Sequence, residues 1–142
     1  AQKELITQTL LVKQRSVFCL EPPGYSPPRK SMIDSMLMGC LPVFFMDRSV
    51  RSQYLPLHFE WGYNASVTID PTEFLAGRVD LNRVLGSFSA ERVRSMQSVL
   101  ADKAQQLVFD IDPSVDTPLR GGAVETLLRG LLQRSVRSKK RE

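Results

Sequence analysis

The sequence is poor in the residues that build metal centres, disulfide scaffolds and membrane spans. Its 142 residues include two cysteines, one histidine and one tryptophan. No apolar run approaches the roughly 18 residues that a transmembrane helix needs. Two cysteines are too few for a disulfide scaffold, and the spacing of the cysteines and the lone histidine matches no zinc site. What remains is the composition of a globular domain, with 42% hydrophobic and 24% charged residues.

The two cysteines both lie in apolar stretches, Cys19 in VFCL and Cys40 in MGCLPV. A cysteine in such a setting usually packs as a small buried hydrophobe, so we expect two free, buried thiols. A Cys19–Cys40 bridge is the alternative, because the strands that carry them could be neighbours.

Positive charge is concentrated at the C-terminal end of the chain. There are 19 Lys and Arg residues against 15 Asp and Glu residues, a formal net charge of +4. Six of these cations lie in residues 129–142 beside a single acid, so the body of the chain is close to neutral. A short basic run can bind nucleic acid. Because the body is near neutral and lacks a basic-aromatic pattern, we expect a solvated tail and no nucleic-acid partner.

Strand-like and helix-like segments alternate near the start of the chain. Residues 16–20 are rich in strand formers, residues 29–39 have helical spacing, and residues 41–45 are continuously apolar. Two such strands joined by a helix predict a right-handed βαβ unit. Residues 65–69 predict a third strand. The last of these segments ends at Asp70-Pro71.

The remaining patterns predict helices. Asp70, Asp80 and Ser89 are candidate N-caps, because their side chains can accept hydrogen bonds from the first amides of a helix. The first predicted helix has apolar residues at positions 5, 6, 10, 11 and 12 and is expected to pack along one face. The predicted helices cover residues 4–14, 71–79, 80–87, 89–111 and 121–136.

Together these segments predict an α/β fold, a Rossmann-like half-domain with a short parallel sheet flanked by helices. The predicted half-domain covers residues 1–112, and a C-terminal helix with the basic tail covers residues 113–142. A complete doubly wound domain usually has more than three strands, and the first residue is not methionine. We therefore expect a piece of a longer protein.

The turn between the first strand and the second helix carries the most chemistry. Ligands of doubly wound sheets bind outside the carboxyl ends of the strands, where this turn lies. Ser26 is the predicted N-cap, and Pro27 occupies the first helical position. The backbone amides near Arg29, Lys30 and Ser31 would then point out of the helix start, where the helix dipole favours an anion. The sequence predicts a diphosphate site there.

Two further residues of this turn have predicted roles. Gly24 lets the turn approach a ligand, because it has no Cβ. Asp34 lies one helical turn beyond Lys30, and its carboxylate suits two adjacent hydroxyls such as those of a ribose. The alternative is that Asp34 pairs with Lys30 on a solvated face. Both interpretations fit the spacing equally well.

The whole segment, FCLEPPGYSPPRKSMIDSMLMGCLPVFF, resembles the signature of exostosin-type glycosyltransferases. In that family a strand ending in Pro-x-Gly is followed by Ser, a basic residue, an acid and Gly-Cys-x-Pro-Val. The step from Asp34 to Gly39 and Pro42 also resembles an element of the wider GT-B glycosyltransferases. The resemblance covers roughly residues 15–109.

The resemblance implies that the chain is the C-terminal, donor-binding half of a GT-B fold. By the resemblance, Gly24, Tyr25, Ser26 and Arg29 would line the diphosphate and Asp34 would hold the ribose. Lys30 and Ser31 belong to the same diphosphate site. No catalytic residue is assigned.

Glu21 ends the first predicted strand. It could face the sugar of the donor, or it could be a solvated loop carboxylate.

The implied activity is transfer of a sugar from a nucleotide diphosphate sugar to a glycan or glycoprotein acceptor, with inversion and without a bound metal or other cofactor. The acceptor site would lie on a missing N-terminal half-domain. The resemblance also implies the lumenal side of a Golgi or other secretory-pathway membrane, where Asn64, in an Asn-Ala-Ser sequon, could be glycosylated. The alternative is a non-catalytic α/β module that binds a nucleotide or glycan.

Overall fold

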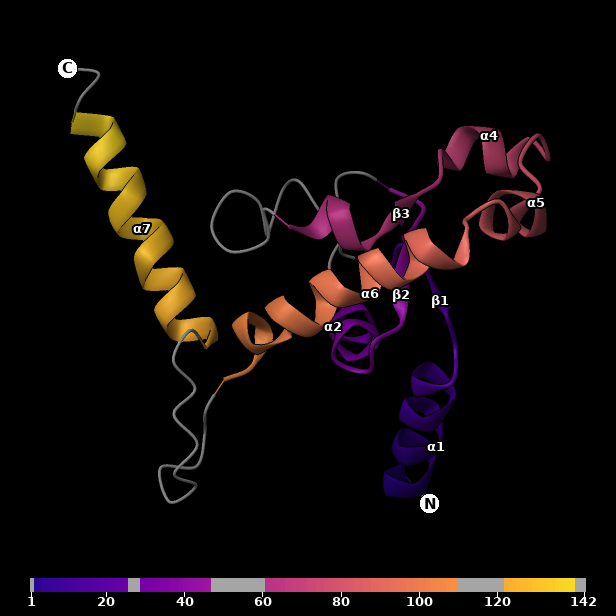
Figure 1. Cartoon of the computed structure of the whole chain (residues 1–142), viewed down its shortest axis with the longest axis horizontal. Helices are drawn as coiled ribbons and strands as arrows, with labels where there is room; N and C mark the ends of the chain where they lie inside the picture. Colours follow the sequence, from indigo (N-terminus) through magenta and orange to yellow (C-terminus); the bar gives the residue numbers. More distant parts are fainter. Residues whose placement is uncertain (1, 26–28, 47–60, 110–121, 140–142) are drawn as a thin grey trace.

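The computed structural model shows a small α/β body from which two helices extend (Figure 1). Helix α1 leads away from the body at the N-terminal end, and helix α7 does so at the C-terminal end. The boundary predicted at residues 112 and 113 lies outside the described residues. The structure describes residues 2–25, 29–46, 61–109 and 122–139.

The body is built on a three-stranded parallel sheet in the order β1-β2-β3. Strand β1 covers Phe18–Glu21, β2 covers Leu41–Phe44 and β3 covers Val67–Thr68. Every residue of β2 is buried, as expected for a central strand covered on both faces. Pro42 is tolerated in this strand because the ladder with β3 begins only at Val43. The predicted short parallel sheet is confirmed.

Helix α2, Lys30–Leu37, connects β1 to β2 and completes the predicted βαβ unit. Met32 and Met36 are buried on the face of α2 that packs into the core. Gly39 follows the helix with φ at 76°, a left-handed conformation that glycine adopts without strain. The predicted stop at this glycine is therefore confirmed.

The other predicted helices are present, and their N-caps are confirmed. Asp70 accepts hydrogen bonds from the amides of the next helix, and Asp80 and Ser89 each accept one at the start of theirs. The long helix predicted to reach residue 111 is shorter, because a tighter helical turn replaces its end. In the described ranges, no helix is both long enough and apolar enough to cross a membrane. The elements are η1 Gly62–Ala65, α4 Pro71–Leu75, α5 Leu81–Gly86, α6 Ala90–Lys103, η2 Ala104–Leu107 and α7 Ala123–Lys139.

A single hydrophobic core joins the sheet to helices α2 and α6. Met96 and Leu100 of α6 are almost fully buried against it. Trp61 is also buried, and its indole Nε1 donates a 2.9 Å hydrogen bond to Gln106 Oε1. The burial of Trp61 shows that it is a core residue and not a surface on which a sugar could stack. The buried core residues are Met32, Met36, Leu41, Val43, Phe44, Phe45, Trp61, Ala65, Val67, Ile69, Met96, Leu100 and Leu107.

Helix α1, Gln2–Gln14, does not pack as its apolar pattern predicts. Leu5, Ile6 and Val12 are 65%, 53% and 64% exposed. The expectation of an apolar face packed against the body is wrong for these residues. A charged side chain near the end of α1, Lys13, makes hydrogen bonds that tie the helix to the body.

The expectation of two free thiols is also wrong, because Cys19 and Cys40 form a disulfide. Cys19 lies in β1 next to Pro42 of β2, and Cys40 directly precedes β2. Parallel pairing of the two strands brings the two Cα atoms to 5.8 Å, within the range that a disulfide requires. The alternative interpretation, a Cys19–Cys40 bridge, is therefore correct. The apolar residues around each cysteine did not favour it.

Removing this disulfide should lower the free energy of unfolding. It closes a loop with a sequence separation of 21, for which the loss of unfolded-state entropy contributes about 3 kcal/mol. Denaturant unfolding with and without a reductant measures the difference. The Cys19→Ser/Cys40→Ser variant, which should be insensitive to the reductant, is the control. Equal stability of the oxidised and reduced wild type would contradict the prediction.

Candidate functional site

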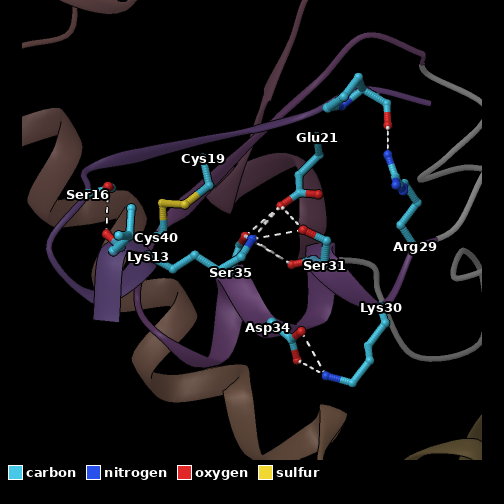
Figure 2. A network of polar contacts seen from close by, with 12 residues as sticks. Lys13, Ser16, Cys19, Glu21, Arg29, Lys30, Ser31, Asp34, Ser35 and Cys40 are labelled. Carbon is cyan, nitrogen blue, oxygen red and sulfur yellow. Dashed lines mark hydrogen bonds and ion pairs between the residues drawn. A yellow bond between two sulfur atoms is a disulfide. The ribbon is translucent and has the colours of Figure 1, made fainter. Parts of the chain in front are cut away.

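The candidate site lies where strand β1 ends and helix α2 begins. After Glu21 the chain makes an exposed turn through Pro22–Tyr25, and Arg29 then leads into α2. Figure 2 shows the side chains that surround this helix start. The turn lies at the carboxyl end of a parallel strand, the edge at which doubly wound sheets bind ligands.

Within the ranges that the structure describes, backbone amides in the first turn of α2 have no acceptor. Arg29 is the N-cap, with extended backbone angles of −130° and 142°, and no side chain caps the helix. The amide of Met32 donates to the Arg29 carbonyl at 3.1 Å. For the amides of Lys30 and Ser31, the described part of the chain provides no acceptor. An anion at this helix start would supply one.

The predicted helix start is wrong by three residues. Sequence reasoning placed Ser26 at the N-cap and Pro27 at the first helical position, whereas the N-cap is Arg29. Two consecutive prolines at 27 and 28 explain the difference, because a residue that precedes proline disfavours the helical region. Ser26 lies outside the described residues, and its role toward the diphosphate stays a prediction.

Arg29 brings a positive charge to the helix start. Its side chain is exposed, and Nη1 donates a long 3.3 Å hydrogen bond to the Pro22 carbonyl. A Cβ on Gly24 would lie 3.4 Å from Arg29 Nε, in ordinary van der Waals contact, so the Arg29 side chain folds back closely over the turn at Gly24. Among the described residues no carboxylate pairs with Arg29. Its charge is therefore available to a ligand.

Lys30 and Asp34 pair with each other on the outer face of α2. Lys30 Nζ lies 2.6 and 2.8 Å from the two carboxylate oxygens of Asp34. The Lys30 side chain is 83% exposed and that of Asp34 is 23% exposed. The predicted ion pair on a solvated face is thus confirmed. A pair of this kind contributes only about 0.3–0.5 kcal/mol, so a ligand could displace it, and the ribose role of Asp34 stays a prediction.

A buried polar cluster lies on the opposite, inner face of α2. We use the term Lys13 cluster for Lys13, Glu21, Ser31 and Ser35. Lys13 Nζ lies 3.1 Å from Glu21 Oε1, 2.9 Å from Ser31 Oγ and 2.5 Å from Ser35 Oγ. It also donates to the Ser31 carbonyl at 3.1 Å. The side chains of Lys13 and Glu21 are 11% and 4% exposed, so this is a buried ion pair that ties α1 to β1 and α2.

The Lys13 cluster changes two sequence expectations. Glu21 is buried at the end of a strand, so the interpretation as a solvated loop carboxylate is wrong. The hydroxyl of Ser31 is engaged in the cluster, so only its amide is left for the predicted diphosphate contact, which stays a prediction. Sequence reasoning missed Lys13 altogether. The available signal was a lysine near the end of a helix that precedes a strand ending in an acid.

Two predicted residues lie apart from this geometry. The Tyr25 side chain is fully exposed. Asn64 is exposed in η1, while Ser66 of the same sequon is buried and donates from Oγ to the Gly62 carbonyl at 2.6 Å. The exposure of Asn64 is compatible with a glycan, and both roles stay predictions.

A Rossmann-like α/β body with an open helix start at the carboxyl end of its first strand is typical of proteins that bind nucleotides. The family model for the exostosin GT47 domain matches residues 6–81. The chain belongs to this family, and the resemblance seen in the sequence is confirmed. The matched range includes the whole candidate site.

Curated relatives from Arabidopsis thaliana carry glycosyltransferase names. The chain is 32% identical over 123 residues to a probable xyloglucan galactosyltransferase, GT13, covering 87% of this chain and 26% of that protein. It is 38% identical over 99 residues to the xyloglucan galactosyltransferase XLT2, covering 70% and 19%. It is 38% identical over 85 residues to xyloglucan-specific galacturonosyltransferase 1, covering 60% and 13%. The chain thus spans about a quarter or less of the length of these relatives. No solved structure matches it.

Removal of the buried lysine should destabilise the fold far more than removal of the exposed one. Lys13→Met leaves the Glu21 carboxylate buried without its cation, which should cost about 3 kcal/mol. Lys30→Met, the matched control, removes only an exposed pair and should cost less than about 0.5 kcal/mol. Chemical denaturation measures both. Similar losses in the two variants would show that the Lys13 cluster does not stabilise the fold.

Proposed function

We propose that the chain is the donor-binding half of a GT-B glycosyltransferase, which transfers a sugar from a nucleotide diphosphate sugar to a glycan. Membership of the exostosin GT47 family and the names of the relatives support this assignment. The observation that carries it is the start of α2 at the carboxyl end of β1. There Arg29 lies beside the amides of Lys30 and Ser31, for which the described residues provide no acceptor. These hydrogen-bond donors and the positive charge fit the two phosphoryl groups of a nucleotide diphosphate sugar.

The relatives also suggest which substrates to test first. Two are named xyloglucan galactosyltransferases and one a xyloglucan-specific galacturonosyltransferase. We therefore infer a galactose-type sugar on the donor and a xyloglucan-like polysaccharide as acceptor. The acceptor would bind to an N-terminal half-domain outside this chain.

In the proposed reaction the helix start stabilises the leaving group. As the bond between the sugar and the diphosphate breaks, negative charge grows on the terminal phosphoryl oxygen. The amides of Lys30 and Ser31 and the guanidinium of Arg29 would stabilise that charge. A base outside the described residues would take the proton of the acceptor hydroxyl, which attacks from the opposite face and inverts the anomeric carbon.

We infer that this stabilisation needs no bound metal, because the helix start and Arg29 already supply positive charge. The sequence contains one Asp-x-Asp triplet, Asp110-Ile111-Asp112, whose carboxylate oxygens are ligands that divalent cations prefer. It lies outside the described residues. Donor affinity that is equal in EDTA and in millimolar Mn²⁺ supports the inference, and affinity that requires Mn²⁺ contradicts it.

We also infer that the domain works on the lumenal side of a secretory-pathway membrane, such as that of the Golgi. The Cys19–Cys40 disulfide supports this, because structural disulfides persist in oxidising compartments. The exposed Asn64 sequon supports it independently.

Replacing Arg29 should weaken diphosphate binding selectively. Arg29→Ala in the full-length protein should raise the Kd for UDP about tenfold to a hundredfold, the effect of losing a charge-assisted contact. Isothermal titration calorimetry measures this Kd, with UDP or with GDP, depending on which nucleotide the wild type binds. Arg78→Ala is the matched control, because Arg78 pairs with Glu73 on the exposed surface, where its hydrogen bond lowers the pKa of Glu73.

Unchanged nucleotide affinity in Arg29→Ala would place the diphosphate elsewhere. A wild-type protein that binds neither UDP nor GDP would contradict the proposed function. Nucleotide binding without any transfer of labelled galactose from UDP-galactose to xyloglucan would favour the alternative of a non-catalytic binding module.

Replacing Asp34 should affect the nucleoside and not the phosphates. If Asp34 holds the ribose, Asp34→Ala should weaken UDP binding about tenfold and leave the affinity for inorganic pyrophosphate unchanged. Competition titrations with both ligands measure this. A parallel change in both affinities would mean that Asp34 acts only through its pair with Lys30, and Lys30→Ala should then reproduce it.

A further inference from the structure

The two carboxylate oxygens of Glu21 have different surroundings. Oε1 accepts hydrogen bonds from Lys13 Nζ at 3.1 Å, Ser31 Oγ at 3.2 Å and Ser35 Oγ at 2.6 Å. For Oε2, the residues that the structure describes provide no donor at all. Because the side chain is only 4% exposed, bulk water does not solvate this oxygen freely.

A buried acceptor without a donor is unusual in a folded protein. Buried polar atoms nearly always have a hydrogen-bond partner, and an exception needs an explanation such as a ligand or an ordered water. A carboxylate can accept about four hydrogen bonds through its two oxygens, and here all three fall on one of them. The free oxygen of Glu21 can therefore accept a hydrogen bond from a donor other than the residues that the structure describes.

The free oxygen lies on the ligand side of the helix start. Glu21 is the last residue of β1, at the edge where doubly wound sheets bind their ligands. In Figure 2, Oε2 points out of the Lys13 cluster, on the side on which Arg29 lies. The same view shows Asp34 on the opposite side of α2, paired with Lys30.

The charges around the site determine which chemical group could bind Glu21. A phosphate oxygen is an acceptor and an anion, so it cannot bind a carboxylate oxygen. A hydroxyl can donate to it without adding charge. Lys13 balances the charge of Glu21, so this carboxylate can lie close to the diphosphate site without opposing it strongly. Of the groups on a nucleotide diphosphate sugar, a neutral hydroxyl fits this oxygen best.

A nucleotide diphosphate sugar carries hydroxyls on both sides of its diphosphate, on the ribose and on the sugar. With the diphosphate at the start of α2, one carboxylate lies on each side of the helix, Asp34 and Glu21. Resting on the proposed function, we propose that Glu21 Oε2 accepts a hydrogen bond from a hydroxyl of the transferred sugar. Glu21 is then a positioning residue that recognises the sugar, while Asp34 recognises the ribose.

The test compares a ligand that has the sugar with one that lacks it. In the full-length protein, titration with UDP and with UDP-galactose gives the ratio of their two Kd values. Glu21→Gln places an amide donor where the free acceptor stood, so the advantage of UDP-galactose over UDP should fall about tenfold. Ser35→Ala is the matched control, because it removes a donor to Oε1 and leaves Oε2 in place.

In Ser35→Ala the ratio should stay at the wild-type value even if stability falls. If Glu21→Gln does not fold, Glu21→Asp replaces it, because it keeps the charge and shortens the reach. The wild type and Glu21→Asp are then titrated with UDP-galactose analogues that each lack one sugar hydroxyl. The analogue that binds the wild type about tenfold more weakly should lose nothing further in Glu21→Asp.

Each outcome decides between the two proposals. If the ratio of the two Kd values is unchanged in Glu21→Gln, the role of Glu21 is overturned while nucleotide binding stands. The same holds if the loss of affinity from removing a sugar hydroxyl adds fully to the loss in Glu21→Asp. A wild-type protein that binds no nucleoside diphosphate overturns the proposed function itself, and the role of Glu21 with it.

Discussion

The start of helix α2 depends on the buried ion pair between Lys13 and Glu21. Through the serines on the inner face of α2, this pair joins α1, β1 and α2 at one point. At the other end of β1–α2–β2, the Cys19–Cys40 disulfide fixes the two strands that the helix connects. Held in this way, α2 presents its first amides at the carboxyl end of β1. The candidate site needs no cap from within the described residues, because the anion is expected to supply it.

The arrangement also separates the charges around the site. Lys13 and Glu21 balance each other inside the fold, and Lys30 and Asp34 do so at its surface. Arg29 pairs with no carboxylate in the ranges that the structure describes. One unbalanced cation beside amides that lack an acceptor in those ranges suits a dianionic group better than a general basic surface does, because the helix start fixes the direction of the amides. The two carboxylates flanking α2 would then distinguish the two ends of the ligand.

Much of the fold could be predicted from the sequence, because local patterns determine it. The βαβ unit follows from two apolar runs around a helical segment, and Asp70, Asp80 and Ser89 cap their helices as expected. The disulfide could not be predicted from apolar context, since it depends on which strands pair. The Lys13 cluster was missed for the same reason, because Lys13 meets Ser31 and Ser35 only through the tertiary fold. The turn chemistry predicted where the candidate site lies, but it did not predict the hydrogen bonds around that site.

A crystal structure of the full-length protein with UDP tests the central claim most directly. The account predicts that the two phosphoryl groups lie within hydrogen-bonding distance of the Lys30 and Ser31 amides, with the Arg29 guanidinium turned away from the Pro22 carbonyl and toward them. Phosphoryl groups bound at another edge of the sheet, with Arg29 still folded over the turn, would contradict it.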